Sequence, residues 1–174
     1  IVIKPTWRAY EPLSDDVVVA LDPGMAFGTG LHPTTRLCLV GLERWSDAGL
    51  VAGASVIDVG CGSGILAVAA GLLGARELRG VDTDPIAVEA TRENAARNGV
   101  AVSASAGSLP VDGGPFDLVL ANLTEGILNF VARMLPGAEV LAHVESNDAF
   151  CHGMFNHASN VAGNRARRID ASQT

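Results

Sequence analysis

The stretch that decides the fold is VIDVGCGSGILAVAA, residues 56–70. It begins with a β-branched apolar run typical of a buried parallel strand, and it ends in an Ala- and Leu-rich segment that favours a helix. Between the two lie Gly60, Gly62 and Gly64. Because glycine lacks a β-carbon, its backbone adopts positive φ readily and lets a ligand approach closely. The stretch predicts a strand, a tight glycine loop and a helix.

A second signal lies about 20 residues downstream, where Leu78–Val81 predicts another strand and Asp82 follows it. In open α/β sheets, nucleotides bind at the carboxyl ends of the strands, and an acidic residue at this position accepts hydrogen bonds from the ribose hydroxyls. The loop spacing GCGSG differs from the G-x-G-x-x-G of dinucleotide-binding enzymes. Together with Asp58, the loop and Asp82 predict a nucleoside-binding site.

The composition of the chain limits its class. The 174 residues, 48% of them hydrophobic, suffice for one domain with a sizeable core. A net charge of −7 argues against a nucleic-acid-binding surface, although it would favour an encounter with a basic protein. The three cysteines include no C-x-x-C pair, so neither disulfides nor a metal site is expected. No signal peptide or apolar run of about 18 residues occurs, which predicts a cytoplasmic protein without membrane contact.

The rest of the chain alternates between strand and helix patterns. Further strands are predicted at 100–103, 116–121 and 140–144, with helices that begin near Pro33, Pro85 and Gly126. This alternation predicts an α/β fold with a mostly parallel sheet and helices on both faces, a three-layer sandwich. Two early apolar runs predict a leading hairpin within residues 1–24. Residues 143–174 break the pattern, and we expect them to form a poorly structured tail.

With these features in hand, the chain resembles the class I S-adenosylmethionine-dependent methyltransferases. Within that class it is similar to the family that methylates ribosomal protein L-eleven (PrmA). The resemblance covers residues 1–142 and rests on four blocks in order: LDPGMAFGTGLHPTT at 21–35, VIDVGCGSGILAVAA at 56–70, GVDTDPIAVEATRENAARNG at 80–99 and FDLVLANL at 116–123. It implies a Rossmann-like methyltransferase that modifies amino groups, lysine side chains and the N-terminus, of a ribosomal protein.

The resemblance also implies how S-adenosylmethionine would be held. Thr35 would contact the methionine end of this cofactor, and Phe27 and Thr29 would form a lid over it. Ile86 or its neighbours would pack near the adenine.

The strand ends would supply the remaining contacts. Gly60 and Gly62 would let the main chain approach the cofactor, and Asp82 would hold the ribose. Asn122 would line the place where the methyl group leaves, and as the candidate catalytic residue it would accept a hydrogen bond from the amine.

Several of these residues also have a structural interpretation. Asp82 is a candidate N-cap for the helix at Pro85, although Asp84 is better placed for that role. Asn122 is also typical of a turn that ends a strand. Asp58 is expected to brace the glycine loop rather than to take part in chemistry.

Two departures from the family bear on function. Family members carry an N-terminal module that binds the ribosomal protein, and nothing before Ile1 corresponds to it. Because the chain does not begin with Met, we expect that an upstream segment was removed. Family members also continue into two further strands, which we expect this chain to lack. The alternatives are therefore a truncated cofactor-binding remnant without activity and an NAD-dependent oxidoreductase, and the oligomeric state stays open.

Overall fold

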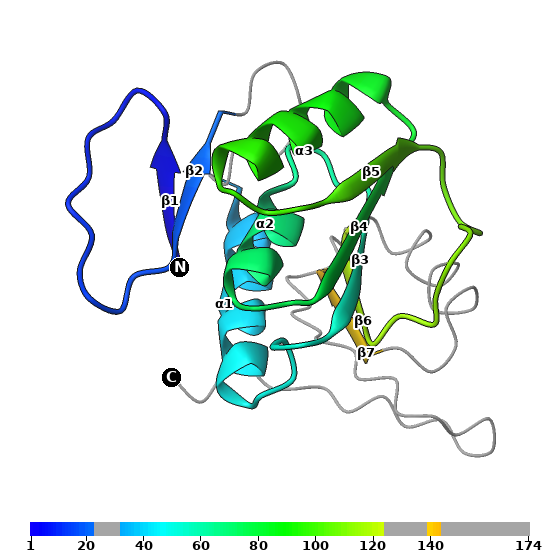
Figure 1. The fold of residues 1–174 in the computed structure, drawn as a ribbon, viewed down its shortest axis with the longest axis horizontal. Helices are drawn as coiled ribbons and strands as arrows, with labels where there is room; N and C mark the ends of the chain where they lie inside the picture. The colour runs from blue at the N-terminus through cyan, green and yellow to red at the C-terminus, as the bar shows by residue number, and fades with distance from the viewer. Residues whose placement is uncertain (23–31, 124–138, 144–174) are drawn as a thin grey trace.

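The computed structural model describes residues 1–22, 32–123 and 139–143. Its centre is a five-stranded sheet with the order β5-β4-β3-β6-β7 (Figure 1). Every neighbouring pair in this sheet is parallel, which confirms the predicted α/β fold with a mostly parallel sheet. The strands are β3 (Ser55–Val59), β4 (Glu77–Asp82), β5 (Ser103–Ala106), β6 (Leu118–Asn122) and β7 (Glu139–His143).

The strand order brings the predicted site residues to one edge of the sheet. β3 lies in the middle, and all five of its residues are buried, as its apolar run predicts. Val59, its last residue, pairs with Val81 of β4 on one side and with Ala121 of β6 on the other. Asp82 and Asn122 follow directly, so the carboxyl ends of three strands lie side by side.

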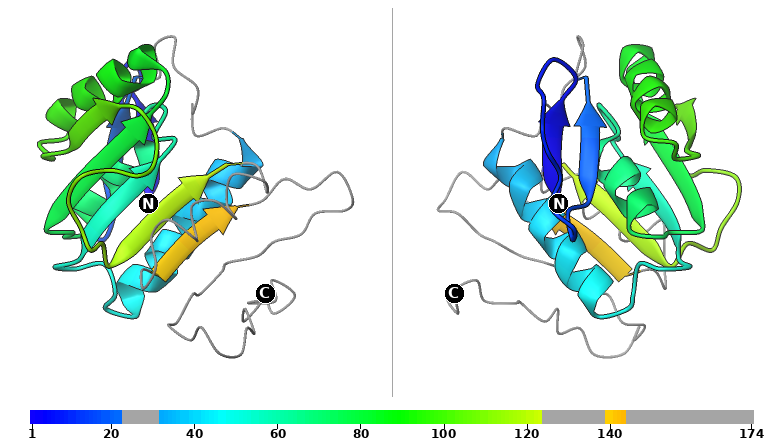
Figure 2. Two further views of the ribbon diagram at one scale, coloured as in Figure 1. Left: turned by 90° about the vertical axis from the view of Figure 1, so that its right-hand side faces the viewer. Right: turned by 60° about the vertical axis from the view of Figure 1, so that its left-hand side comes forward.

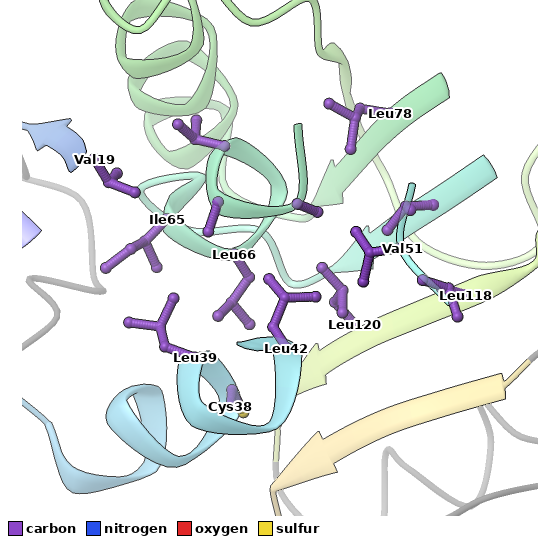
Figure 3. Close-up of a cluster of buried hydrophobic side chains, with 14 of the residues drawn as sticks. Val19, Cys38, Leu39, Leu42, Val51, Ile65, Leu66, Leu78, Leu118 and Leu120 are labelled. Carbon is purple, nitrogen blue, oxygen red and sulfur yellow. The ribbon is translucent and has the colours of Figure 1, made fainter. Parts of the chain in front are cut away.

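Among the described residues, three helices cover one face of this sheet (Figures 1 and 2). They are α1 (Pro33–Asp47), α2 (Ile65–Leu72) and α3 (Pro85–Arg97), which begin where the sequence predicts. Their apolar side chains form the larger core cluster with β3 and β6, where Leu39, Leu42 and Leu66 lie near Leu120 (Figure 3). The helix predicted from Gly126, and with it the second helical layer, lies outside the described residues.

A smaller core cluster lies on the opposite face of the sheet. Phe116 and Leu109, from the connection between β5 and β6, cover the side chains that the central strands direct to this face. These side chains are Ile57, Val59, Val81, Val119 and Ala121. The central strands β3 and β6 are therefore buried on both faces, which is why they are largely apolar.

The expected leading hairpin is wrong. β1 (Val2–Pro5) and β2 (Val18–Leu21) form a separate two-stranded sheet, and they pair in parallel (Figure 1). A hairpin needs only a short turn, whereas a parallel pair needs a connection of about a dozen residues, which residues 6–17 provide. β2 packs on α2 and α3, so this small sheet lies on the outer side of the helices.

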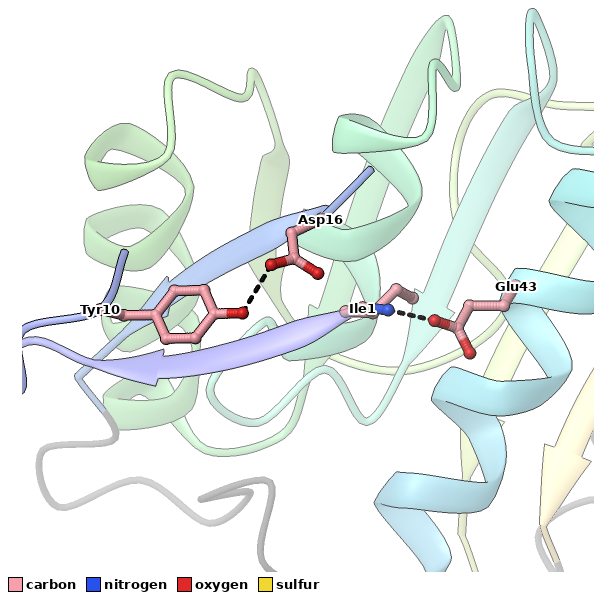
Figure 4. A network of polar contacts seen from close by, with 4 residues as sticks. All are labelled: Ile1, Tyr10, Asp16 and Glu43. Atoms are coloured by element: carbon pink, nitrogen blue, oxygen red, sulfur yellow. Dashed lines mark hydrogen bonds and ion pairs between the residues drawn. The ribbon is translucent and has the colours of Figure 1, made fainter. Parts of the chain in front are cut away.

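Polar contacts hold the small sheet and its connection. The carboxylate of Asp16 accepts hydrogen bonds from the hydroxyl of Tyr10, at 2.5 Å, and from the main-chain N–H of Leu13, at 2.8 Å (Figure 4). The ammonium group of Ile1 forms an ion pair with Glu43 of α1 (Figure 4). The ion pair anchors the start of the described chain to the first helix, and the Asp16 hydrogen bonds hold the connection between β1 and β2.

One strand begins later than the sequence predicts. The strand expected at 100–103 is β5, which starts at Ser103. Val100 instead closes the end of α3, because its N–H donates to the carbonyl of Ala95, and its side chain packs on the larger core.

Of the tail predicted from residue 143, only His143 is described, and it ends β7. Within the part of the chain that the structure describes, no helix is both long and apolar enough to cross a bilayer.

Candidate functional site

The glycine loop between β3 and α2 uses the conformational freedom that its sequence predicts. Gly60, Gly62 and Gly64 have φ values of 72°, 55° and 78°, in the left-handed region that residues with a β-carbon rarely adopt. The N–H of Gly60 donates to the carbonyl of Val81 at 2.8 Å, which ties the start of the loop to β4. The loop therefore turns sharply at the end of β3 and delivers the chain to the N-terminus of α2.

Asp58 braces the helix that follows the loop. Gly64, the N-cap of α2, has no side chain to accept a hydrogen bond from the first turn. Asp58 supplies that acceptor from β3, because its Oδ2 accepts from the N–H of Ala67 at 3.2 Å. The carboxyl is almost fully buried, and this burial raises its pKa to about 7; the Ala67 hydrogen bond lowers the pKa and the charge of Asp82 raises it further. Asp58 was expected to brace the glycine loop, and its hydrogen bond reaches the first turn of the helix that follows the loop.

Asp82 is oriented by two main-chain donors. Its Oδ2 accepts from the N–H of Gly62 and its Oδ1 accepts from the N–H of Asp84, each at 3.0 Å. An ionised carboxylate has about four acceptor positions, so each oxygen can take a further hydrogen bond. Asp82 does not cap α3. Asp84 does so, as expected, because its Oδ1 accepts from the N–H of Ile86 at 2.9 Å.

Asn122 and Thr35 are brought together at the other side of the loop. The Nδ2 of Asn122, at the end of β6, donates to the Oγ1 of Thr35 in the first turn of α1, at 3.2 Å. Thr35 is buried, whereas Asn122 is partly exposed. His32 precedes α1 as its N-cap, and its Nδ1 lies 2.7 Å from the Oγ1 of Thr34. Two residues that the family resemblance assigns to one site are therefore in contact.

Leu123 fills the space beside Gly60, whose positive φ already favours glycine. A β-carbon at Gly60 would lie 2.6 Å from the Cδ2 of Leu123, which is closer than such atoms approach. Leu123 packs against the smaller core cluster. The sequence contains no local signal for the contact between Leu123 and Gly60. The cofactor contact that the family resemblance assigns to Gly60 stays a prediction.

Helix α3 holds the opposite side of the loop through residues that the sequence analysis missed. The hydroxyl of Thr91 donates to the carbonyl of Gly62 at 3.0 Å, and the Nδ2 of Asn94 donates to the carbonyl of Ser63 at 2.9 Å. Thr91 and Asn94 are both fully buried. Two polar residues three apart, on the buried side of a helix, are the signal that could have identified them.

Cys61 lies inside the loop but has no features of a reactive thiol. Its side chain is buried, and this burial is the main reason why its pKa is raised to about 12. The hydroxyl of Thr91 lies 3.2 Å from the sulfur. Because only the thiolate is a good nucleophile, the observed environment agrees with the packing role that small size suggests.

The remaining predicted site residues are only partly accounted for. Phe27 and Thr29 lie outside the described residues. Ile86 lies in the first turn of α3 and is 49% exposed, which leaves it available to a ligand. Within the described ranges, no group of three His, Cys, Asp or Glu residues is arranged to hold a metal ion.

The glycine loop at a helix N-terminus, with an acidic residue ending the next strand of a parallel sheet, is the arrangement of the Rossmann-like α/β fold of class I methyltransferases. A family model described as ribosomal protein L11 methyltransferase (PrmA) matches residues 1–151. The chain belongs to this family.

Individual relatives agree with the family match. The ribosomal protein L11 methyltransferase of Citrifermentans bemidjiense is 46% identical over 167 residues, which are 90% of this chain and 55% of that protein. The crystal structure of the ribosomal protein L11 methylase of Lactobacillus delbrueckii subsp. bulgaricus matches with a TM-score of 0.70 and 38% identity, over 82% of this chain and 76% of that one.

A more distant structure shares the fold. The RNA methyltransferase of Salinibacter ruber, solved in complex with S-adenosyl-L-homocysteine, matches with a TM-score of 0.52 and 25% identity, over 61% of this chain and 76% of that one. The chain spans about half the length of the curated relatives that it matches.

Proposed function

We propose that this chain is the S-adenosylmethionine-binding part of an enzyme that methylates amino groups of ribosomal protein L11. One observation carries the proposal: the glycine loop, Asp82 and the Thr35–Asn122 pair meet at the carboxyl ends of three adjacent strands. Membership of the L11 methyltransferase family supports the reaction class and the substrate.

The residues present suit the cofactor. The two donors that hold Asp82 fix the carboxylate plane and leave one acceptor position or more on each oxygen. Two such positions suit the two hydroxyls of a ribose. The N-terminal end of α2 and the left-handed glycines bring main-chain groups to the same edge. The S-adenosylhomocysteine bound to the Salinibacter enzyme, which shares this fold, supports the same ligand class.

S-adenosylmethionine supplies a methyl group that its sulfonium already activates. The protein then mainly has to align a neutral amine with that carbon and remove water from it. Asn122 is suited to this task, since its Nδ2 donates to Thr35 and its Oδ1 is an acceptor. That oxygen would accept a hydrogen bond from the amine and orient the amine's lone pair. We assign the proton that the amine loses to solvent.

The substrate assignment rests on the family and on charge. The net charge of −7 favours approach to a basic protein over approach to nucleic acid. Because the relatives are bacterial enzymes named for a ribosomal protein, we place the activity in the cytoplasm. The family match argues against an NAD-dependent oxidoreductase, as does the loop spacing.

Titration calorimetry on the 174-residue chain tests the cofactor, with S-adenosylmethionine, S-adenosylhomocysteine and NAD as ligands. We expect both sulfur nucleosides to bind and NAD not to bind. Transfer of labelled methyl groups to purified L11 then tests the reaction. Binding without transfer would support the cofactor-binding remnant, whereas preferential binding of NAD would overturn the proposal.

A further inference from the structure

We propose that Asn94 of α3 is a positioning residue for the cofactor site, because its side chain joins the glycine loop to the end of β2. The inference rests on the proposed function, in which the glycine loop binds S-adenosylmethionine. It assigns the coupling of two distant segments to one amide group. Asn94 itself does not need to touch the ligand.

The amide of Asn94 contacts both segments at once. Its Nδ2 donates to the carbonyl of Ser63 in the glycine loop and to the carbonyl of Asp22, each at 2.9 Å. Its Oδ1 accepts from the N–H of Asp22 at 3.0 Å and from Arg97 at 2.5 Å. The fully buried side chain thus uses both of its donors and both of its acceptor positions. Because every donor and acceptor of this amide is used, its orientation is fixed, and it holds Ser63 and Asp22 in fixed positions relative to each other.

Asn98, one turn further along α3, makes the same kind of contact with β2 but none with the glycine loop. Its Oδ1 accepts from the N–H of Ala20 at 2.8 Å, and its Nδ2 donates to the carbonyl of Ala20 at 2.7 Å. Its second donor contact is to the carbonyl of Asn94, within the same helix. Asn98 therefore pairs with the main chain of β2 as Asn94 pairs with Asp22, but Asn98 is not bonded to the loop.

The two asparagine side chains bond the main chain at the end of β2 as a neighbouring strand would. Four residues along a helix advance about 6 Å, and two residues along a strand advance about 6.6 Å. The Asn94–Asn98 spacing therefore matches the spacing from Asp22 to Ala20, and each amide satisfies one N–H and one carbonyl of the strand. The end of β2 is held in register with α3 at two points.

Only the first of these two points reaches the cofactor site. Asp22 belongs to the family-specific block at 21–35, which also contains Thr35 and the proposed lid residues. Ser63 lies between Gly62, whose N–H binds Asp82, and Gly64, the N-cap of α2. Asn94 thus connects the start of that block to the loop, so a displacement of one segment is transmitted to the other.

A pair of matched variants, Asn94→Ala and Asn98→Ala, tests the inference. Urea unfolding should show that both variants are less stable, because each loses buried hydrogen bonds to β2. Calorimetry should show that Asn94→Ala weakens S-adenosylmethionine binding at least about tenfold, whereas Asn98→Ala binds as the wild type does. Equal losses of affinity in the two variants, or no loss in Asn94→Ala, would overturn the positioning role.

A second readout separates this inference from the proposed function. Hydrogen exchange on the ligand-free chain should be faster at Gly62, Ser63 and Gly64 in Asn94→Ala and unchanged there in Asn98→Ala. If Asn94→Ala does not fold, Asn94→Asp takes its place, since it keeps the acceptor for the N–H of Asp22 and loses the donor to the carbonyls of Ser63 and Asp22. Failure of the wild-type chain to bind S-adenosylmethionine would refute the proposed function. Unchanged hydrogen exchange of the glycine loop in the Asn94 variant would refute the role of Asn94 in holding that loop.

Discussion

The side-chain amide of Asn122 donates a hydrogen bond to the hydroxyl of Thr35, from the end of β6 to the first turn of α1, across 87 positions of sequence. This bond sets the orientation of an amide at the sheet edge where Asp82 and the glycine loop also lie. It joins the family-specific block at 21–35 to the strand that ends in Asn122. A single contact therefore connects two motifs that look independent in the sequence.

A double-mutant cycle measures this bond. Thr35→Val removes the acceptor with little change in shape, and Asn122→Ala removes the donor. Because the two groups bond each other, we expect a coupling of about 0.5–1.5 kcal/mol in the free energy of unfolding, measured in urea. The control is Thr34→Val, whose hydroxyl lies beside His32, and its effect should add to that of Asn122→Ala. Additive effects for Thr35→Val would show that the bond contributes nothing.

Asp82 offers a test of cofactor binding. Asp82→Ala should weaken S-adenosylmethionine binding by about 1.5–3 kcal/mol, the usual scale for hydrogen bonds to a charged group. Calorimetry measures this change. The control is Asp84→Ala, which removes the N-cap of α3 and should cost about 1 kcal/mol of stability while leaving the affinity intact. Wild-type affinity in Asp82→Ala would remove Asp82 from the site.

Asp58 should give the protein a distinctive pH dependence. Burial raises its pKa from 3.8 to about 7, so between these values the folded chain holds a proton that the unfolded chain releases. The contribution of Asp58 to stability is therefore largest below the unfolded pKa and falls as the pH rises towards 7. Asp58→Asn has no carboxyl that titrates at this position. Between pH 3.8 and about 7, its free energy of unfolding relative to the wild type should therefore rise with pH, by up to about 1.4 kcal/mol per pH unit.

Asp117 is the control for this measurement, because its pKa moves in the opposite direction. The N–H and the hydroxyl of Ser55 both bind its carboxylate and lower its pKa. Its contribution is present above the ordinary pKa and is lost as the pH falls through the folded value. The difference between Asp117→Asn and the wild type should therefore change only below about pH 4. Urea titrations at several pH values would contradict both expectations if the two variants behaved alike.

Gly60 should tolerate a side chain less well than Gly99 does. Both have positive φ, 72° and 66°, so Gly60→Ala and Gly99→Ala each carry the left-handed cost of about 1–2 kcal/mol. A β-carbon at Gly99 meets nothing within 4 Å, whereas one at Gly60 meets Leu123. Thermal unfolding should therefore give a lower Tm for Gly60→Ala than for Gly99→Ala. Adding Leu123→Ala to Gly60→Ala should cost less than it does in the wild type, and equal costs would contradict the clash.

The individual strands, the glycine loop and the helix starts could be predicted because each depends on residues that are neighbours in the sequence. The apolar run of β3, the left-handed glycines and the proline at the start of α3 each act on neighbouring residues, and the structure has these elements where the sequence predicts them. The Asp84 cap was predictable for the same reason. Parallel pairing in the central sheet followed from the alternation of strands and helices, since each helix returns the chain to the same edge.

The direction of β1 relative to β2 could not be predicted in this way. Both runs are short and apolar, and such runs are compatible with antiparallel or parallel pairing. The direction depends on the length of the connection at residues 6–17, which hydrogen bonds to Asp16 stabilise, and on the packing of β2 against α2 and α3. None of these contacts is visible as a pattern in either strand.

By itself, the sequence determined the strand–loop–helix unit at 56–70, the acidic strand end at Asp82 and the family to which the chain belongs. These follow from local backbone preferences and from motifs that stand in a fixed order. Only the tertiary structure decided which polar groups meet: Asn122 with Thr35, and Asn94 with both Asp22 and Ser63. Such bonds join segments far apart in the chain, so they exist only once the helices have packed on the sheet and have excluded water from the groups between them.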